Sequence, residues 1–261
     1  MRRCICIAFV LTIGIFLSSA AIASDDVEYS QTTEQTINFR DIEWGVDERS
    51  FVDLFKEEGN EIKATYSEYG TGKSYSASST SYGDGNIVPI VSSKNVPTRE
   101  YWIQREGFGF LCQVAGHNVW SIRAGFFEHA SYAPSYPAGL YYINIGIADH
   151  KTITEIEQYN DLYNKLCTLY GTPYTYEHSG GSIVYGVSEY ITSVWIGANN
   201  TSVYLRYSNN LKDDELDSVY ITYGLSDSYT RFAQLDQEYA LYLENQKNKQ
   251  LDSMKDDYSG L

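Results

Sequence analysis

The sequence is short of basic residues. It holds 19 Lys and Arg against 34 Asp and Glu. Arg2 and Arg3 lie in an N-terminal leader, so the remainder has 17 basic residues against 34 acidic ones, a balance of −17. A chain this acidic repels phosphate backbones and anionic lipid surfaces. We therefore expect no nucleic-acid partner.

Long apolar runs are also scarce, and the one from Cys4 to Phe16 lies at the N-terminus. Arg2 and Arg3 precede it, and Ala21-Ile22-Ala23 supplies a small-x-small cleavage pattern. The run is shorter than the roughly 20 residues of a good spanning helix, and no later segment resembles a stop-transfer sequence. The pattern predicts a signal peptide over residues 1–23 and a secreted or envelope-associated protein without a membrane span. A retained N-terminal anchor is the alternative.

Cysteine is rare as well. Signal cleavage would leave only Cys112 and Cys167. One disulfide in an oxidising compartment and two buried thiols both account for this pair. The two cysteines are widely spaced with no neighbouring histidine pattern, which argues against a zinc site. We predict neither a metal nor any other cofactor.

Common catalytic motifs are missing. The chain has no Gly-x-Ser-x-Gly elbow and no His-Glu-x-x-His helix. Residues 70–74 end like a P-loop, but Ser67 stands where a further Gly is required. The acid-His neighbours, such as Glu177-His178, face opposite ways on a strand and cannot form dyads. We predict no catalytic residue; Cys112 with a distant histidine, or two carboxylates in one cleft, are the enzymatic alternatives.

Apolar periodicity indicates an α+β fold with an antiparallel sheet, two packed helices and a C-terminal helix. Asp47 is a good N-cap for the first helix, and Thr154 with Glu157 makes a capping box for the second. Residues 226–245 read as the third helix. Strands are expected at residues 37–44, 108–114, 119–127, 140–147, 192–197, 201–208 and 218–223.

The same pattern divides the chain into regions. Residues 24–36 read as a mobile leader, 37–225 as the α+β domain, and 226–261 as a helix with a polar tail. A tandem arrangement would give halves at 37–148 and 149–225, each with a helix and a hairpin. The Tyr/Ser/Gly-rich segment 65–86 reads as a long loop or a weak strand pair.

Two features of the strands bear on function. Trp44-Gly45 reads as a hinge between strand and helix, with Trp44 packed on the stripe of Phe51 and Phe55. In the 119–127 strand, alternation places Trp120 on the same face as the apolar residues Ile122, Ala124 and Phe126. Trp44 is therefore expected in the scaffold rather than in a binding site.

Tyrosine is abundant, with 25 residues. A Tyr ring is rigid and apolar with a polar tip, and suits both sheet surfaces and recognition. The candidate binding residues are Tyr66, Tyr69, Tyr75, Tyr82, Tyr132 and Tyr136. They favour a non-catalytic module that binds another extracellular protein or peptide. A glycan-binding module is the second hypothesis, and an extracellular hydrolase is the third.

The segment Phe39-Arg40-Asp41-Ile42-Glu43-Trp44-Gly45 resembles the Phe-Arg-Gly-Ile-Pro-Trp-Gly-like opening of an uncharacterised group of bacterial secreted proteins and lipoproteins. Asp41 and Glu43 depart from that pattern at its Gly and Pro positions. The resemblance implies a bacterial exported protein and transfers no catalytic residue. The helix-then-hairpin order is also similar, at fold level, to the tandem α+β domains of β-lactamase-inhibitor proteins, which grip another protein.

Overall fold

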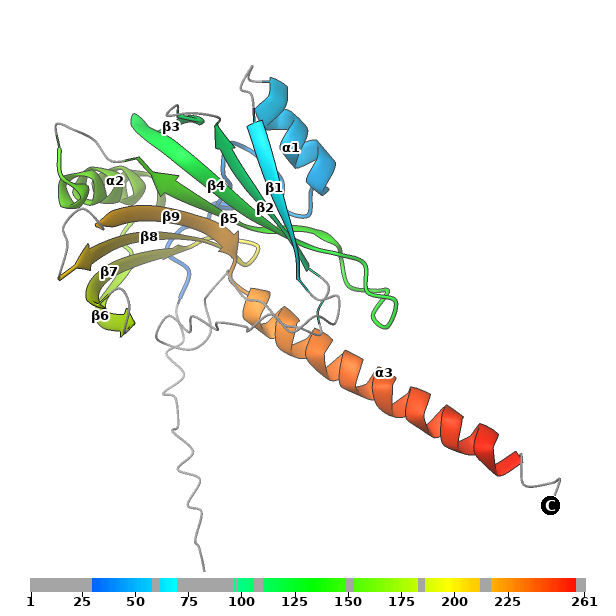
Figure 1. The fold of residues 1–261 in the computed structure, drawn as a ribbon. Coiled ribbons are helices and arrows are strands. Elements are labelled where there is room, and N and C mark those ends of the chain that lie inside the picture. Colours follow the sequence, from blue (N-terminus) through cyan, green and yellow to red (C-terminus); the bar gives the residue numbers. More distant parts are fainter. Residues whose placement is uncertain are drawn as a thin grey trace, which may run out of the picture.

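The protein folds around one antiparallel sheet, seen in a computed structural model (Figure 1). The structure describes residues 30–57, 62–69, 96, 98–105, 110–148, 153–182, 186–211 and 217–256. Within these ranges the chain forms three helices and nine strands. The predicted α+β class, with an antiparallel sheet and a C-terminal helix, is therefore confirmed.

The helices are α1 (Glu48–Glu57), α2 (Glu155–Tyr170) and α3 (Ser228–Asp256). The strands are β1 (Ile62–Tyr69), β2 (Thr98–Arg105), β3 (Cys112–Val114), β4 (His117–Phe127), β5 (Gly139–Ile147), β6 (Tyr174–Ser182), β7 (Gly186–Ile196), β8 (Thr201–Asn210) and β9 (Ser218–Leu225). Their order across the sheet is β1-β2-β4-β5-β9-β8-β7-β6, and β3 pairs with β4 beside this path.

The predicted caps of the first two helices are present. Asp47 accepts a hydrogen bond from the Ser50 backbone N–H at 3.0 Å, which satisfies one unpaired donor of α1. Thr154 and Glu157 form the full capping box of α2. Gly171, with φ of 81°, ends α2 by donating its N–H to the Cys167 carbonyl oxygen at 2.9 Å. The local sequence therefore sets both ends of α2.

Helices α1 and α2 cover the same face of the sheet. Phe51 of α1 meets Phe126 of β4 edge-on, with ring centroids 5.6 Å apart. Tyr159 of α2 hydrogen-bonds Ser193 of β7 at 2.8 Å, and its ring is buried. Both helices belong to one core cluster with the sheet residues that face them. The main core is therefore the layer between this face and the two helices.

Helix α3 packs differently. Near its start, Phe232 and Leu235 are buried against Phe127 and Tyr141, in a second cluster. The rest of α3 extends away from the sheet (Figure 1). The helix is longer than predicted, because it continues through Asp256 rather than ending near residue 245.

Both halves of the expected tandem arrangement contribute to the one sheet. The join is the pairing of β5 with β9, which runs from Tyr142–Gly224 to Gly146–Tyr220. Each half supplies one of the helices that cover the main core. The sheet also contains β1, β2 and β6, three strands that lie partly or wholly outside the strand segments predicted from the sequence.

The expected strand over residues 37–44 is wrong. Arg40 and Asp41 have positive φ angles of 51° and 58°, which break an extended run. Just before it, Thr36 forms an isolated bridge to Ala198, and the Thr32 N–H bonds the Ile196 carbonyl oxygen at 2.8 Å. The described part of the expected leader, residues 30–36, is thus hydrogen-bonded to the sheet.

The Trp44-Gly45 corner lies within the scaffold. Trp44 is half-buried against both core clusters, and its indole N–H donates to the Ile37 carbonyl oxygen at 3.0 Å. Gly45 has φ of 84° and donates its N–H to the Leu140 carbonyl oxygen at 3.1 Å. A Cβ added to Gly139 would lie 2.2 Å from the Gly45 carbonyl oxygen. The two glycines therefore allow two backbone segments to touch.

We predict that Gly139→Ala lowers the free energy of unfolding by about 3 kcal/mol or more, because it adds backbone strain to a backbone collision. Gly116 is the matched control, because it also has a positive φ, of 87°, yet an added Cβ there meets no atom within 4 Å. Gly116→Ala should cost only about 1 to 2 kcal/mol. Urea unfolding of both variants measures the difference; equal losses would contradict the close approach.

Candidate functional site

The sheet face opposite α1 and α2, which we call the far face, carries polar and aromatic residues. Strand register identifies them, because directly paired residues project to the same side. One row across β2, β4, β5, β9, β8 and β7 reads Trp102, Arg123, Asn144, Thr222, Tyr204 and Val194. The next row, across β5, β9, β8, β7 and β6, reads Gly146, Tyr220, Arg206, Thr192 and Tyr176.

The β2–β4 part of the far face is built on Arg123. Its guanidinium carbon lies 4.3 Å from the centre of the Trp102 ring, a cation–π contact. Arg123 Nε also lies 3.1 Å from Glu100 Oε1, and the Trp102 indole N–H donates to the same oxygen at 3.0 Å. Trp102 nevertheless keeps 37% of its surface exposed. The ion pair and the hydrogen bond thus fix the orientation of a tryptophan that solvent still reaches.

Tyr142 completes this cluster from β5. Its hydroxyl donates to Glu100 Oε2 at 2.5 Å, while its ring is buried and lies over Gly125, where an added Cβ would collide with it. Burial, and next the Glu100 carboxylate, raises the pKa of the Tyr142 hydroxyl well above 10.0. Tyr142 therefore remains a neutral donor at every pH near neutrality, and Glu100 accepts hydrogen bonds from Tyr142 and Trp102 while it forms an ion pair with Arg123.

Trp120 lies on the far face, and the prediction that it shares the apolar face of β4 is wrong. The pairing of β4 with β5 shifts between Val119 and Ser121, so Trp120 is the extra residue of a bulge. Its indole lies over Gly146, where an added Cβ would sit 2.5 Å from Nε1. The side chain remains 40% exposed. The bulge thus redirects a second tryptophan away from the core.

A second arginine–aromatic cluster lies on β6, β7 and β8. The Arg206 guanidinium carbon is 4.2 Å from the centre of the Tyr190 ring, and His178 stacks on Tyr190 with ring centroids 4.9 Å apart. Arg206 Nη2 lies 3.3 Å from His178 Nε2. A guanidinium has no acceptor, so this contact is a hydrogen bond only when Nε2 is unprotonated. All three side chains are half-buried.

Of the six tyrosines proposed from the sequence as binding residues, Tyr132 and Tyr136 are the ones whose side chains the structure describes. Tyr132 and Tyr136 lie at the base of α3, where Tyr132 contacts the Tyr239 ring at 5.2 Å and the Tyr136 hydroxyl donates to Gln234 at 2.8 Å. Burial raises the pKa of Tyr132 to about 12. Only the backbone positions of Tyr66 and Tyr69 in β1 are described, and Tyr75 and Tyr82 lie outside the described residues.

Of the cysteines within the described ranges, neither forms a disulfide. Cys112 and Cys167 are half-buried thiols that pack against the main core cluster.

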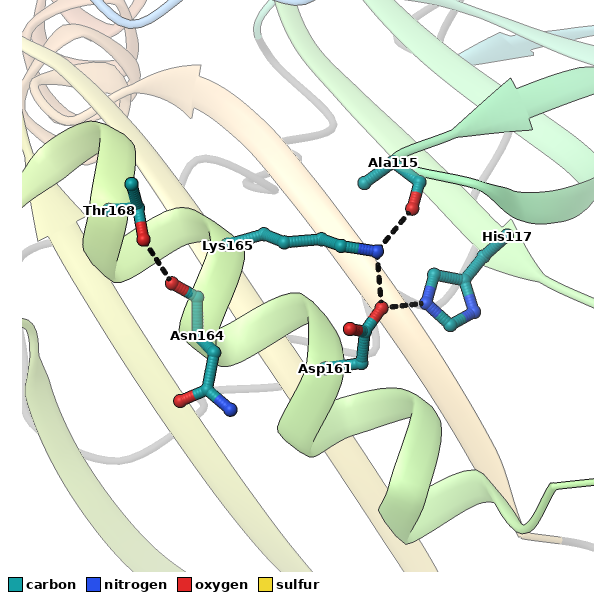
Figure 2. A network of polar contacts seen from close by, with 6 residues as sticks. All are labelled: Ala115, His117, Asp161, Asn164, Lys165 and Thr168. Carbon is teal, nitrogen blue, oxygen red and sulfur yellow. Dashed lines mark hydrogen bonds and ion pairs between the residues drawn. The ribbon is translucent and has the colours of Figure 1, made fainter.

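A separate polar cluster ties α2 to the β3–β4 turn (Figure 2). Asp161 of α2 accepts from Lys165 at 2.5 Å and lies 2.6 Å from His117 Nε2. Lys165 also donates to the Ala115 carbonyl oxygen at 2.7 Å, in a turn where Ala115 and Gly116 have positive φ. Each member thus holds the helix against the turn, which gives the cluster a structural role.

Comparison of the chain with protein-family models, curated proteins and solved structures gave no match. The resemblance to an exported bacterial group therefore stays a prediction. Within the described ranges, no helix combines the length and the apolar content needed to cross a bilayer. The same residues contain no group of three His, Cys, Asp or Glu side chains placed to hold a metal ion.

The Asp161 contacts predict a pH dependence. Hydrogen bonds from Lys165 first, and then from His117, lower the pKa of Asp161 below 3.8. A folded-state pKa below the unfolded one stabilises the fold above the unfolded value, and this stabilisation is lost as pH falls through the folded value. Asp161→Asn should therefore destabilise the protein at pH 7 by less than about 1 kcal/mol, since the pair is exposed.

The difference between the wild type and Asp161→Asn should shrink as pH falls below about 4. Urea unfolding of both chains at pH 7 and at successive acidic pH values measures it. Arg49→Gln is the control, since its 3.9 Å pair with Asp53 lies away from the turn. A difference that stays constant to the lowest pH would contradict the assigned role of Asp161.

Proposed function

We propose that this protein is a non-catalytic binding module that acts outside the cytoplasm and holds a protein or peptide partner on the far face of its sheet. The observation that carries the proposal is the pair of exposed tryptophans, Trp102 and Trp120, at 37% and 40% exposure. The leader over residues 1–23 supports the compartment.

The chemistry of the far face supports a protein partner. Residues that dominate the binding energy of protein interfaces are enriched in Trp, Tyr and Arg. Trp102 with Arg123, and Tyr190 with Arg206, pair those residue types in fixed contacts on the far face. Side chains already held in one orientation lose less entropy when a partner binds. Large, rigid aromatic surfaces beside arginine are therefore a reason to expect protein recognition here.

The contacts of the Glu100 carboxylate on the far face favour a binding role over acid–base catalysis. Glu100 is only 14% exposed at its side chain, accepts hydrogen bonds from Tyr142 and Trp102, and forms an ion pair with Arg123. A general base must reach a substrate proton at hydrogen-bond distance. Glu100 instead holds the tryptophan and the arginine in place.

Glycan binding is the second candidate, and the geometry of Trp120 favours it. The indole lies over Gly146 on the sheet surface and keeps 40% of its area exposed. A flat aromatic ring fixed on a sheet offers an apolar face on which a sugar ring can stack.

The test compares three versions of the mature chain: the wild type, Trp102→Ala/Trp120→Ala, and Leu169→Ala. Leu169 is 58% exposed on α2, on the opposite side of the sheet, and controls for the loss of exposed apolar area. Each chain is immobilised and exposed to extracellular fluid from its native source. A protein retained by the wild type and by Leu169→Ala should be lost from the double variant.

For the purified partner, the dissociation constant should rise about tenfold or more in the double variant, because each anchor in such an interface is worth more than about 1 kcal/mol. Melting temperatures check that the variant is folded. Binding of an oligosaccharide panel with the same dependence would favour the glycan hypothesis instead. Equal retention by the wild type and a folded double variant would overturn the assignment of the far face.

A further inference from the structure

The projecting part of α3 exposes apolar side chains. Every side chain from Ala240 to Met254 is exposed, including Leu243 at 49%, Leu251 at 47% and Met254 at 64%. Isolated helices of about 12 to 15 residues are marginal in water, and most helices are stabilised by packing of an apolar face. Apart from Tyr242, whose ring lies 6.2 Å from that of Tyr132, this stretch therefore exposes the residues of a packing surface to solvent.

Four of these apolar residues share one side of the helix. At about 100° per residue, Ala240, Leu243, Leu251 and Met254 fall within an arc of about 80°, together with Lys247. This group, which we call the α3 stripe, lies about a quarter-turn from the side of α3 that carries Phe232 and Leu235. The stripe is thus free to meet another helix while the base of α3 remains packed on the sheet.

The α3 stripe is symmetric about Lys247. Leu243 and Leu251 lie four residues before and after it, and Ala240 and Met254 lie seven residues before and after it. A two-fold axis at Lys247 would place Leu243 opposite Leu251 of the second copy, and Ala240 opposite Met254. A surface that matches itself under a two-fold rotation is what a C2 dimer requires.

We propose that two copies of this protein associate through an antiparallel pairing of their projecting α3 helices, centred on Lys247. The interaction is independent of the far face. At each end of the helix pair the small Ala240 would meet the larger Met254 of the second copy. Nearer the axis Leu243 would meet Leu251, as in antiparallel helix packing.

Charge at the axis agrees with this arrangement. Lys247 would meet Lys247 of the second copy, and each of them lies three residues after Glu244 on its own helix. Because Glu244 flanks the stripe, the axis gathers two positive and two negative charges in alternation. A polar residue at one core position of paired helices sets their register at some cost in stability. Lys247 would fix the centre of the pair in this way.

The length of the projecting part of α3 also agrees with an antiparallel pair centred on Lys247. Asp256, the last residue of α3, lies nine residues after Lys247, and Glu238 lies nine residues before it. The helix end of the second copy would therefore lie opposite Glu238, next to Tyr239, where α3 contacts Tyr132 of the sheet domain. The two helices overlap over their exposed lengths, and each ends where the other domain begins.

Sedimentation equilibrium of the mature chain over a wide concentration range tests the pairing. The wild type should show a reversible monomer–dimer equilibrium, and Leu251→Asp should raise its dissociation constant about tenfold or more. Leu241→Asp is the matched control, because Leu241 is equally exposed, at 54%, but lies about 160° from Leu243 around the helix. It should leave the dissociation constant unchanged.

A charge exchange tests the centre of the pair. Lys247→Glu places four acids at the axis and should weaken the dimer, whereas Glu244→Lys/Lys247→Glu restores the alternation and should recover it. A wild type that stays monomeric at all concentrations would overturn the proposal. So would equal effects of the two leucine variants, a double variant no better than Lys247→Glu, or a monomer that binds lipid vesicles through the α3 stripe.

Discussion

The pairing of β5 with β9 is the contact on which the rest of the structure depends. It joins residues such as Asn144 and Thr222, which are 78 positions apart in the sequence and share a side-chain hydrogen bond of 2.7 Å. Because side chains alternate along a strand, this single register decides which residues meet α1 and α2 and which form the far face. A slip by one residue would bury Asn144 and expose Ile143 or Ile145.

Glycine shapes both faces of this sheet. On the far face, Gly125 and Gly146 leave room for the rings of Tyr142 and Trp120 to lie over the backbone. At the edge of the core, Gly45 and Gly139 let two segments touch. The rings of Tyr142 and Trp120 therefore lie against the sheet backbone, and Trp120 keeps this position while 40% of its surface remains exposed.

The far face and the projecting part of α3 have different physical origins. The far face keeps its aromatic rings through cation–π contacts and hydrogen bonds within the sheet. Helix α3 is packed on the sheet domain at its base, by Phe232, Leu235 and Tyr239, and the apolar residues of its projecting part follow helical spacing rather than sheet register. One surface is therefore pre-organised by the fold, whereas the other needs a second helix to bury its apolar residues.

By itself, the sequence determined the fold class, both caps of α2, the start of α1 and the central strands, because caps and apolar periodicity act over a few residues. Only the tertiary structure decided where the side chains of the far face lie. Trp120 lies on the opposite face from the predicted one, because a bulge against β5 adds a residue to β4. Residues 37–44 do not form the predicted strand, because Arg40 and Asp41 have positive φ angles. Trp102 meets Arg123, and Tyr190 meets Arg206, through pairing between strands, which no local pattern of one strand records.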